Sequence, residues 1–111
     1  MIIKEAKRDK ATVLSIEGRI DSVSSSELEK KLITLIETGG VKDIVMDFDA
    51  MDYISSAGLR VLLMAAKKTG KLGGKVVLCG LCANVKEVFD ISGFTNIFGI
   101  YASKEEAAAA M

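Results

Sequence analysis

The sequence has no histidine and no proline, and it contains only two cysteines among its 111 residues. Histidine is the commonest general base and metal ligand of proteins, so its absence argues against a catalytic centre or a metal site. Two cysteines cannot form the disulfide framework of a small secreted domain. We therefore expect a protein that has no catalytic residues, no metal ion and no cofactor of its own.

Net charge and long apolar runs are missing as well. Lys and Arg together number 15, as do Asp and Glu, so the charges cancel. Nucleic-acid binding depends on cationic surface, and a membrane-spanning helix needs roughly 20 apolar residues in a row. The first residues, Met1 to Glu5, also lack the layout of a signal peptide. We expect a cytoplasmic protein that neither binds nucleic acid nor inserts into a membrane.

The residues that are present form alternating strand and helix patterns within a single domain, residues 1–111. Hydrophobic residues make up 50% of the chain, which is enough for a compact core. The predicted strands are Ile2 to Lys7, Ala11 to Glu17, Asp43 to Phe48, Lys75 to Cys79 and a short one near Asn96 to Ile100. This order predicts an α/β fold with a mixed sheet of about four or five strands, packed with about four helices. The first two strands are expected to form an antiparallel hairpin at its edge.

Polar residues mark where the helices begin. Ser24 with Glu27, or Ser26 with Glu29, has the spacing of a capping box before the first helix. Asn84 with Glu87 predicts the start of the third helix, and Ser103 the start of the last. The alanines of that last helix, Lys104 to Met111, favour helix formation but are expected to bury little surface.

One stretch, Met51 to Arg60, lies between a buried strand and a long apolar helix. Serine is a favoured N-cap residue, so Ser55 or Ser56 is expected at the N-terminus of a helix from Ser56 to Thr69. In open α/β sheets, sites form at the carboxyl ends of the strands, and free N–H groups at a helix start favour an anion. A serine hydroxyl there could carry a phosphate. From the spacing alone, however, simple helix capping by both serines is the favoured interpretation.

The same stretch resembles the signature of the STAS domain, which sulphate transporters share with anti-sigma factor antagonists. The signature reads Asp52-Tyr53-Ile54-Ser55-Ser56-Ala57-Gly58-Leu59-Arg60-Val61-Leu62-Leu63. The segment from Gly18 to Asp21 resembles the family's pattern after the second strand. The run Leu78 to Leu81, with later apolar and glycine residues, is similar to its final third. The resemblance covers nearly the whole chain and implies a stand-alone anti-sigma factor antagonist.

The resemblance also implies a switch. In such antagonists the phosphorylated residue lies two positions before the glycine that precedes leucine, which here makes it Ser56. The preceding position is often aspartate in those relatives and is Ser55 here, so a kinase meets two adjacent serines. The implied partners are an anti-sigma factor that is also a serine protein kinase, which supplies ATP and magnesium, and a serine phosphatase. The residues expected to bind the partner are Asp21, Ser22, Asp52, Ser55, Ser56, Gly58 and Arg60.

Four acids could join this site. Asp21 and Asp47 are each expected to end one of two parallel, adjacent strands, so they would share the sheet edge where Ser56 lies. There they could orient the hydroxyl or meet a partner, although ordinary strand-end and turn acids explain them equally simply. Asp49 and Asp52 are expected in a loop.

Two other functions remain open from the sequence. Cys79 and Cys82 have the Cys-x-x-Cys spacing of a thioredoxin-like redox motif. Such a site normally has a cis-proline beside it, and the chain has no proline. The favoured interpretation is therefore two small apolar side chains that fill space. The remaining alternative is an interaction module of a signalling scaffold or transport complex that has no kinase.

Overall fold

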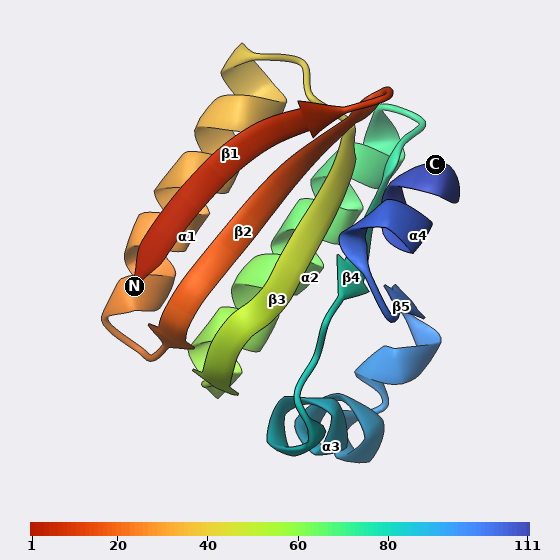
Figure 1. The fold of residues 1–111 in the computed structure, drawn as a ribbon. Helices are drawn as coiled ribbons and strands as arrows, with labels where there is room; N and C mark the ends of the chain where they lie inside the picture. The colour runs from red at the N-terminus through yellow and green to blue at the C-terminus, as the bar shows by residue number, and fades with distance from the viewer.

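A five-stranded mixed sheet forms the centre of the molecule (Figure 1). The structure is a computed structural model that describes residues 1–111. The strands lie side by side in chain order, and their bounds are β1 (Ile2–Arg8), β2 (Ala11–Ile20), β3 (Asp43–Ile54), β4 (Lys75–Cys79) and β5 (Gly99–Tyr101). β1 pairs with β2 in antiparallel fashion, and all other neighbours are parallel. The predicted edge hairpin and mixed sheet are thus confirmed.

Helices cover the two faces of this sheet unequally. They are α1 (Ser24–Ile33), which continues as a π-helical segment (Thr34–Thr38), α2 (Ser56–Lys71), α3 (Ala83–Ser92) and α4 (Lys104–Ala109). In Figure 1, α1 and α2 lie together behind β1 to β3, whereas α4 lies in front of the sheet beside β4 and β5. None of these helices combines the length and the apolar character that crossing a bilayer requires.

Alternating side chains of the strands supply a core on each face. On the face that α1 and α2 cover, Leu14, Met46 and Phe48 are fully buried within the larger apolar cluster. On the opposite face, Val13 and Val45 belong to a smaller cluster that includes Ala107 of α4. The prediction that the C-terminal alanines bury little is therefore wrong, because Ala107 is 0% exposed. Small side chains let this short helix lie close to the sheet.

β3 extends to Ile54, six residues beyond the predicted end at Phe48. The sequence pattern misses this extension because two irregularities interrupt the pairing of β3 with β2. The register shifts by one residue between Ser15 and Glu17, and again between Gly18 and Arg19. Each shift leaves an extra residue on β3, which breaks the two-residue alternation that marks a strand in sequence. The expectation that Asp49 and Asp52 lie in a loop is therefore wrong. Both are exposed residues of β3 itself.

The predicted helix starts are correct for two of the four helices. Ser55 and Ser103 cap α2 and α4 with their side chains, accepting hydrogen bonds from the N–H groups of Gly58 and Glu106. The expected Asn84 cap of α3 is wrong. That helix begins at Ala83, after Cys82, which makes no capping hydrogen bond through its side chain. The predicted capping box at the start of α1 is also absent. The residues that hold this helix start are described with the candidate site, to which they belong.

Candidate functional site

The site lies at the carboxyl ends of β2 and β3, where two segments far apart in the sequence meet. Ile20 at the end of β2 pairs in parallel with Ile54 at the end of β3. The N–H of Ser55 donates to the carbonyl of Ile20 at 2.8 Å, which fastens the start of α2 to the end of β2. The chain therefore brings the Gly18–Ser25 region beside the Asp49–Arg60 region.

The two adjacent serines at the start of α2 have different environments. Ser55 has extended backbone angles and is half-buried, and its Oγ accepts from the N–H of Gly58 at 3.1 Å. That hydrogen bond satisfies one of the donors left free at a helix start. Ser56 is the first residue of the helix, is exposed, and its hydroxyl makes no hydrogen bond within the protein. Of the two, only the Ser56 hydroxyl takes no part in the helix start.

Gly58 allows the first turn of α2 to lie against the sheet. A Cβ atom at this position would lie 2.7 Å from Cγ2 of Ile20 and 2.8 Å from Cγ1 of Ile54. Carbon atoms do not approach so closely, so a side chain here would push the helix start away from the strand ends. Gly58 is itself buried, so it presents no side chain to a partner. Its contribution to the site is to fix the position of Ser56.

The start of α1 is held by Asp21 and not by a capping box of Ser24 with Glu27 or of Ser26 with Glu29. Asp21 Oδ1 accepts from the backbone N–H of Val23 at 3.0 Å, from the N–H of Ser24 at 2.8 Å and from the Ser24 hydroxyl at 2.9 Å. These hydrogen bonds favour the ionised carboxyl, and they lower the pKa of Asp21. Asp21 therefore has a structural role in this turn.

Exposed apolar side chains lie in the two segments that meet at this edge. Val23 is 81% exposed and Tyr53 is 43% exposed. The guanidinium of Arg19 lies over the Tyr53 ring, 4.5 Å from its centroid, within the range of a cation–π interaction. Sequence reasoning included these residues in the two segments but did not single them out. For Val23 the sequence does contain a signal, because a valine among the serines of a helix start is unusual. Nothing comparable marks Arg19 or Tyr53.

The remaining predicted contact residues belong to the same two segments. Ser22 and Asp52 are exposed, Asp52 being the unpaired residue of the second β3 irregularity. Arg60 is exposed on α2, one turn after Ser56. Because residues four apart on a helix are neighbours on its surface, Arg60 shares a face with Ser56.

The prediction that Asp47 shares this edge is wrong. Asp47 lies in the middle of β3, opposite Ser15 of β2, and it alternates with Met46 and Phe48, so it points to the opposite face of the sheet. There its carboxylate accepts from the Ser15 hydroxyl at 2.9 Å and from the N–H of Asp49 at 3.1 Å. The error follows from the early strand end expected at Phe48.

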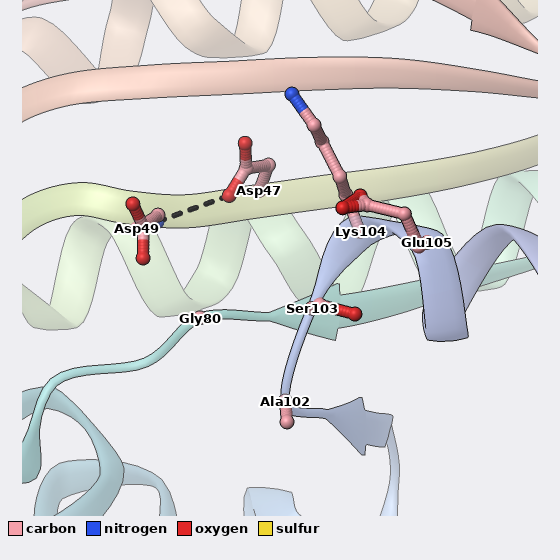
Figure 2. Close-up of a pocket in the computed structure, with 7 residues that line it drawn as sticks. All are labelled: Asp47, Asp49, Gly80, Ala102, Ser103, Lys104 and Glu105. Atoms are coloured by element: carbon pink, nitrogen blue, oxygen red, sulfur yellow. Dashed lines mark hydrogen bonds between the residues drawn. The ribbon is translucent and has the colours of Figure 1, made fainter.

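Asp47 instead lines a hollow of about 200 Å³ on the face that α4 covers (Figure 2). Figure 2 shows Asp47 and Asp49 together on β3, facing the residues that lead into α4. The lining residues are Asp47, Asp49, Gly80, Ala102, Ser103, Lys104 and Glu105. No group of three acidic or sulfur ligands gathers here or elsewhere in the chain in a way that could hold a metal ion. This hollow is separate from the Ser56 edge.

The two cysteines do not act as a matched pair. Both are free, but Cys79 is buried and Cys82 is exposed, so the expectation of two space-filling side chains holds for Cys79 alone. Burial, followed by the charge of Asp47, raises the pKa of the Cys79 thiol to about 12. The thiolate is the reactive form of cysteine, so Cys79 is inert at neutral pH. The geometry gives no support to a redox function.

Comparison with known proteins decides the family. A model of the STAS domain matches residues 3–107. The chain belongs to the STAS domain family. The predicted resemblance and the predicted fold are both confirmed.

The named relatives of this STAS domain are anti-sigma factor antagonists. One of them is BtrV of Bordetella bronchiseptica, which is named as an anti-sigma factor antagonist. It is 42% identical over 104 residues, covering 94% of this chain and 89% of the relative. The anti-sigma-B factor antagonist of Bacillus subtilis is 34% identical over 92 residues, covering 83% of each.

Solved structures share the STAS fold at lower sequence identity. An anti-sigma factor antagonist of Thermotoga maritima superimposes with a TM-score of 0.92 at 18% identity, covering 97% of this chain and 92% of that one. The phosphorylated form of SpoIIAA from Bacillus superimposes with a TM-score of 0.77 at 21% identity, covering 98% of each. At such identities the likeness concerns the fold.

Proposed function

We propose that this STAS domain protein is an anti-sigma factor antagonist that acts in the cytoplasm. It binds an anti-sigma factor that is also a serine kinase, and so releases a sigma factor. Phosphorylation of Ser56 ends the binding, and a serine phosphatase restores it. The names of relatives at 42% and 34% identity support this proposal. The protein acts by binding, and ATP and magnesium belong to the kinase.

The observation that carries the proposal is the contrast between the two serines. Ser55 uses its hydroxyl to cap α2, whereas the Ser56 hydroxyl is exposed and has no partner in the protein. A kinase must reach a free hydroxyl and place it in line with a phosphoryl donor. Ser56 meets that requirement without any change in the fold, whereas Ser55 would first have to release the N–H of Gly58.

The surface around Ser56 suits a protein partner. Val23 and Tyr53 provide exposed apolar area, while Asp21, Asp52 and Arg60 provide charge in the same two segments. Interfaces commonly combine such aromatic and apolar centres with a polar rim. The partner of this surface would therefore cover Ser56 at or near the centre of the contact.

Phosphorylation then acts through local charge. A phosphate on serine adds about −1.5 to −2 charges at pH 7. Enclosing an unpaired charge in an interface costs several kcal/mol, and each 1.4 kcal/mol is about tenfold in affinity. Partner binding should therefore weaken by about tenfold to a thousandfold. The fold itself is expected to persist, because the helix N-terminus favours an anion while nearby carboxylates oppose it.

The test is the affinity for the anti-sigma factor, measured by calorimetry for the unmodified, phosphorylated and Ser56→Asp forms. The unmodified protein and Ser56→Ala should bind tightly, the phosphorylated form weakly, and Ser56→Asp should fall between them. Circular dichroism of each form checks that the fold is retained. Equal affinities for all forms would reject the switch and favour an interaction module that works without a kinase.

A further inference from the structure

Arg60 is a free cation on the same helix face as Ser56. Side chains four residues apart on a helix have Cβ atoms about 5–6 Å from each other. Arg60 is exposed, and it takes part in none of the ion pairs of the structure, which use Lys4, Arg8, Lys31, Lys68 and Lys86. Its guanidinium is therefore within reach of position 56 along the helix surface and is not committed to any carboxylate.

Other charges near Ser56 are already engaged or are of the wrong sign. Arg19 lies over the Tyr53 ring, and its charge helps to lower the pKa of Asp21. Asp21 holds the start of α1, and Asp52 is exposed on β3. The first turn of α2 contains no acid that would compete for Arg60.

The remaining cations of α2 are too far along the helix to reach Ser56. Lys67 follows it by eleven residues, which at 1.5 Å per residue corresponds to about 16 Å along the axis. Lys68 and Lys71 lie farther still, in the last turn. Arg60 is therefore the cation that α2 itself places beside the serine.

We propose that Arg60 is the intramolecular partner of phosphoserine at position 56, an inference that rests on the proposed phosphorylation of Ser56. The planar guanidinium offers paired donors that match phosphate oxygens. An anion placed four residues before a cation is the favourable order on a helix, because it agrees with the helix dipole. The phosphate and Arg60 would form an ion pair on the surface of the first two turns.

This pairing gives the switch a second component. In the unmodified protein, Arg60 is free to contact an acidic group of the partner. After phosphorylation the same guanidinium is held by the phosphate, so the interface gains an anion and loses a free cation together.

The test uses phosphoserine incorporated at position 56 during translation, so that it does not depend on any kinase. Phosphorus NMR follows the second ionisation of the phosphate across pH 5 to 8 in the wild type, in Arg60→Gln and in Arg60→Lys. A cation beside the phosphate favours the dianion, so its pKa should rise on Arg60→Gln by about 0.3 unit or more. Arg60→Lys should restore part of the shift, and added salt should reduce the difference.

Two matched variants make the result specific. Lys67→Gln removes an exposed charge from the same helix at a distance, and Arg19→Gln removes the neighbouring cation of β2. Both should leave the phosphate pKa close to that of the wild type. Equal shifts in all three glutamine variants, or no shift in Arg60→Gln, would overturn the role of Arg60.

The outcomes also separate this inference from the proposed function. If Arg60→Gln changes the phosphate pKa but no kinase modifies Ser56, the ion pair stands and the proposed switch fails. If a kinase modifies Ser56 but the pKa is the same with and without Arg60, the switch stands and the ion pair is rejected.

Discussion

The starts of α1 and α2 follow neighbouring parallel strands, and both are rich in serine, yet Ser24 and Ser56 use their hydroxyl groups in opposite ways. At α1 the side chains of Asp21, Ser24 and Ser25 form a closed network, whereas the exposed Ser22 and Ser26 hydroxyls make no hydrogen bond within the protein. Asp21 accepts from the N–H and the hydroxyl of Ser24, and the Ser25 hydroxyl donates to the carbonyl of Ser22 at 3.0 Å. At α2 only Ser55 caps the helix, and the Ser56 hydroxyl has no partner.

This difference shows why a serine at a helix start is not in itself a modification site. A hydroxyl within a hydrogen-bonded network stabilises the turn, and moving it into a kinase active site would break that network. A hydroxyl that contributes nothing to the turn can be modified at little cost to the fold. The two helix starts therefore differ in what they offer: at α1 Asp21 and Ser24 hold the turn, and at α2 the Ser56 hydroxyl is left free.

The largest expected effect is the loss of phosphorylation in Ser56→Ala. Incubated with its cognate kinase and ATP-magnesium, the wild type should take up one phosphate, and Ser56→Ala should take up none. Intact-protein mass spectrometry and phosphopeptide mapping measure both outcomes. The reason is that Ser56 carries the one unpartnered, exposed hydroxyl of the two adjacent serines.

Two serine variants serve as controls for that experiment. Ser24→Ala removes a hydroxyl of the closed network at α1, and Ser55→Ala removes the α2 cap. Each should retain phosphorylation at Ser56, with Ser55→Ala reduced at most. Phosphate found on Ser24 or on Ser55 alone would break the contrast between the two helix starts.

The next effect concerns the position of α2. Gly58→Ala should destabilise the protein by about 1–3 kcal/mol, because the added Cβ overlaps the buried side chains of Ile20 and Ile54. Gly70→Ala is the matched control in the same helix, since its Cβ would meet nothing within 4 Å. Alanine there should stabilise by up to about 1 kcal/mol. Denaturant unfolding measures both, and equal effects would show that close packing at Gly58 is unimportant.

Much of this arrangement could be predicted from the sequence, because it depends on local signals. The Ser55 cap, the edge hairpin and the order of strands and helices follow from capping preferences, alternation and short connections. The resemblance of the stretch from Asp52 to Leu63 to the STAS signature then singled out Ser56. These features require no knowledge of which residues meet across the sheet.

The errors arose where distant segments decide the local structure. The two irregularities of β3 depend on pairing with β2 and obscure the true end of the strand, so the prediction put Asp47 at the strand end when it lies within the strand. Ser24 and Glu27 have the spacing of a capping box, but Asp21 folds back over the turn and takes that role. The burial of Ala107 depends on a contact with the far face of the sheet.

A smaller effect separates the structural serine from the free one. Ser55→Ala should reduce the free energy of unfolding by about 1 kcal/mol, because it leaves the N–H of Gly58 without its acceptor. Ser56→Ala should change it by less than about 0.5 kcal/mol, since it removes no hydrogen bond. Ser55→Asp should restore most of the loss, because aspartate also caps helices. If both alanine variants lose equal stability, the two serines share the capping role.

The smallest effect is the pH dependence that Asp21 gives to stability. Hydrogen bonds from Ser24 lower its pKa in the folded state below the ordinary value of 3.8. The unfolded chain therefore binds a proton first as the pH falls, so the stabilisation is fully present above about pH 4 and is lost as the pH drops through the folded pKa.

Asp21→Asn tests this pH dependence, because it keeps an oxygen acceptor for the turn but has no charge. The wild type should thus melt slightly higher than Asp21→Asn at pH 7, and the difference between the two melting temperatures should shrink as the pH falls below about 4. Asp90→Asn is a suitable comparison, because Asp90 on α3 also has a lowered pKa but bonds Thr95 and Lys86 away from the site. If both variants show the same pH profile but only Asp21→Asn weakens partner binding, the carboxylate of Asp21 serves the turn and the interface together. A gap between the wild type and Asp21→Asn that does not change with pH would mean that the charge of Asp21 contributes nothing to the closed network at α1.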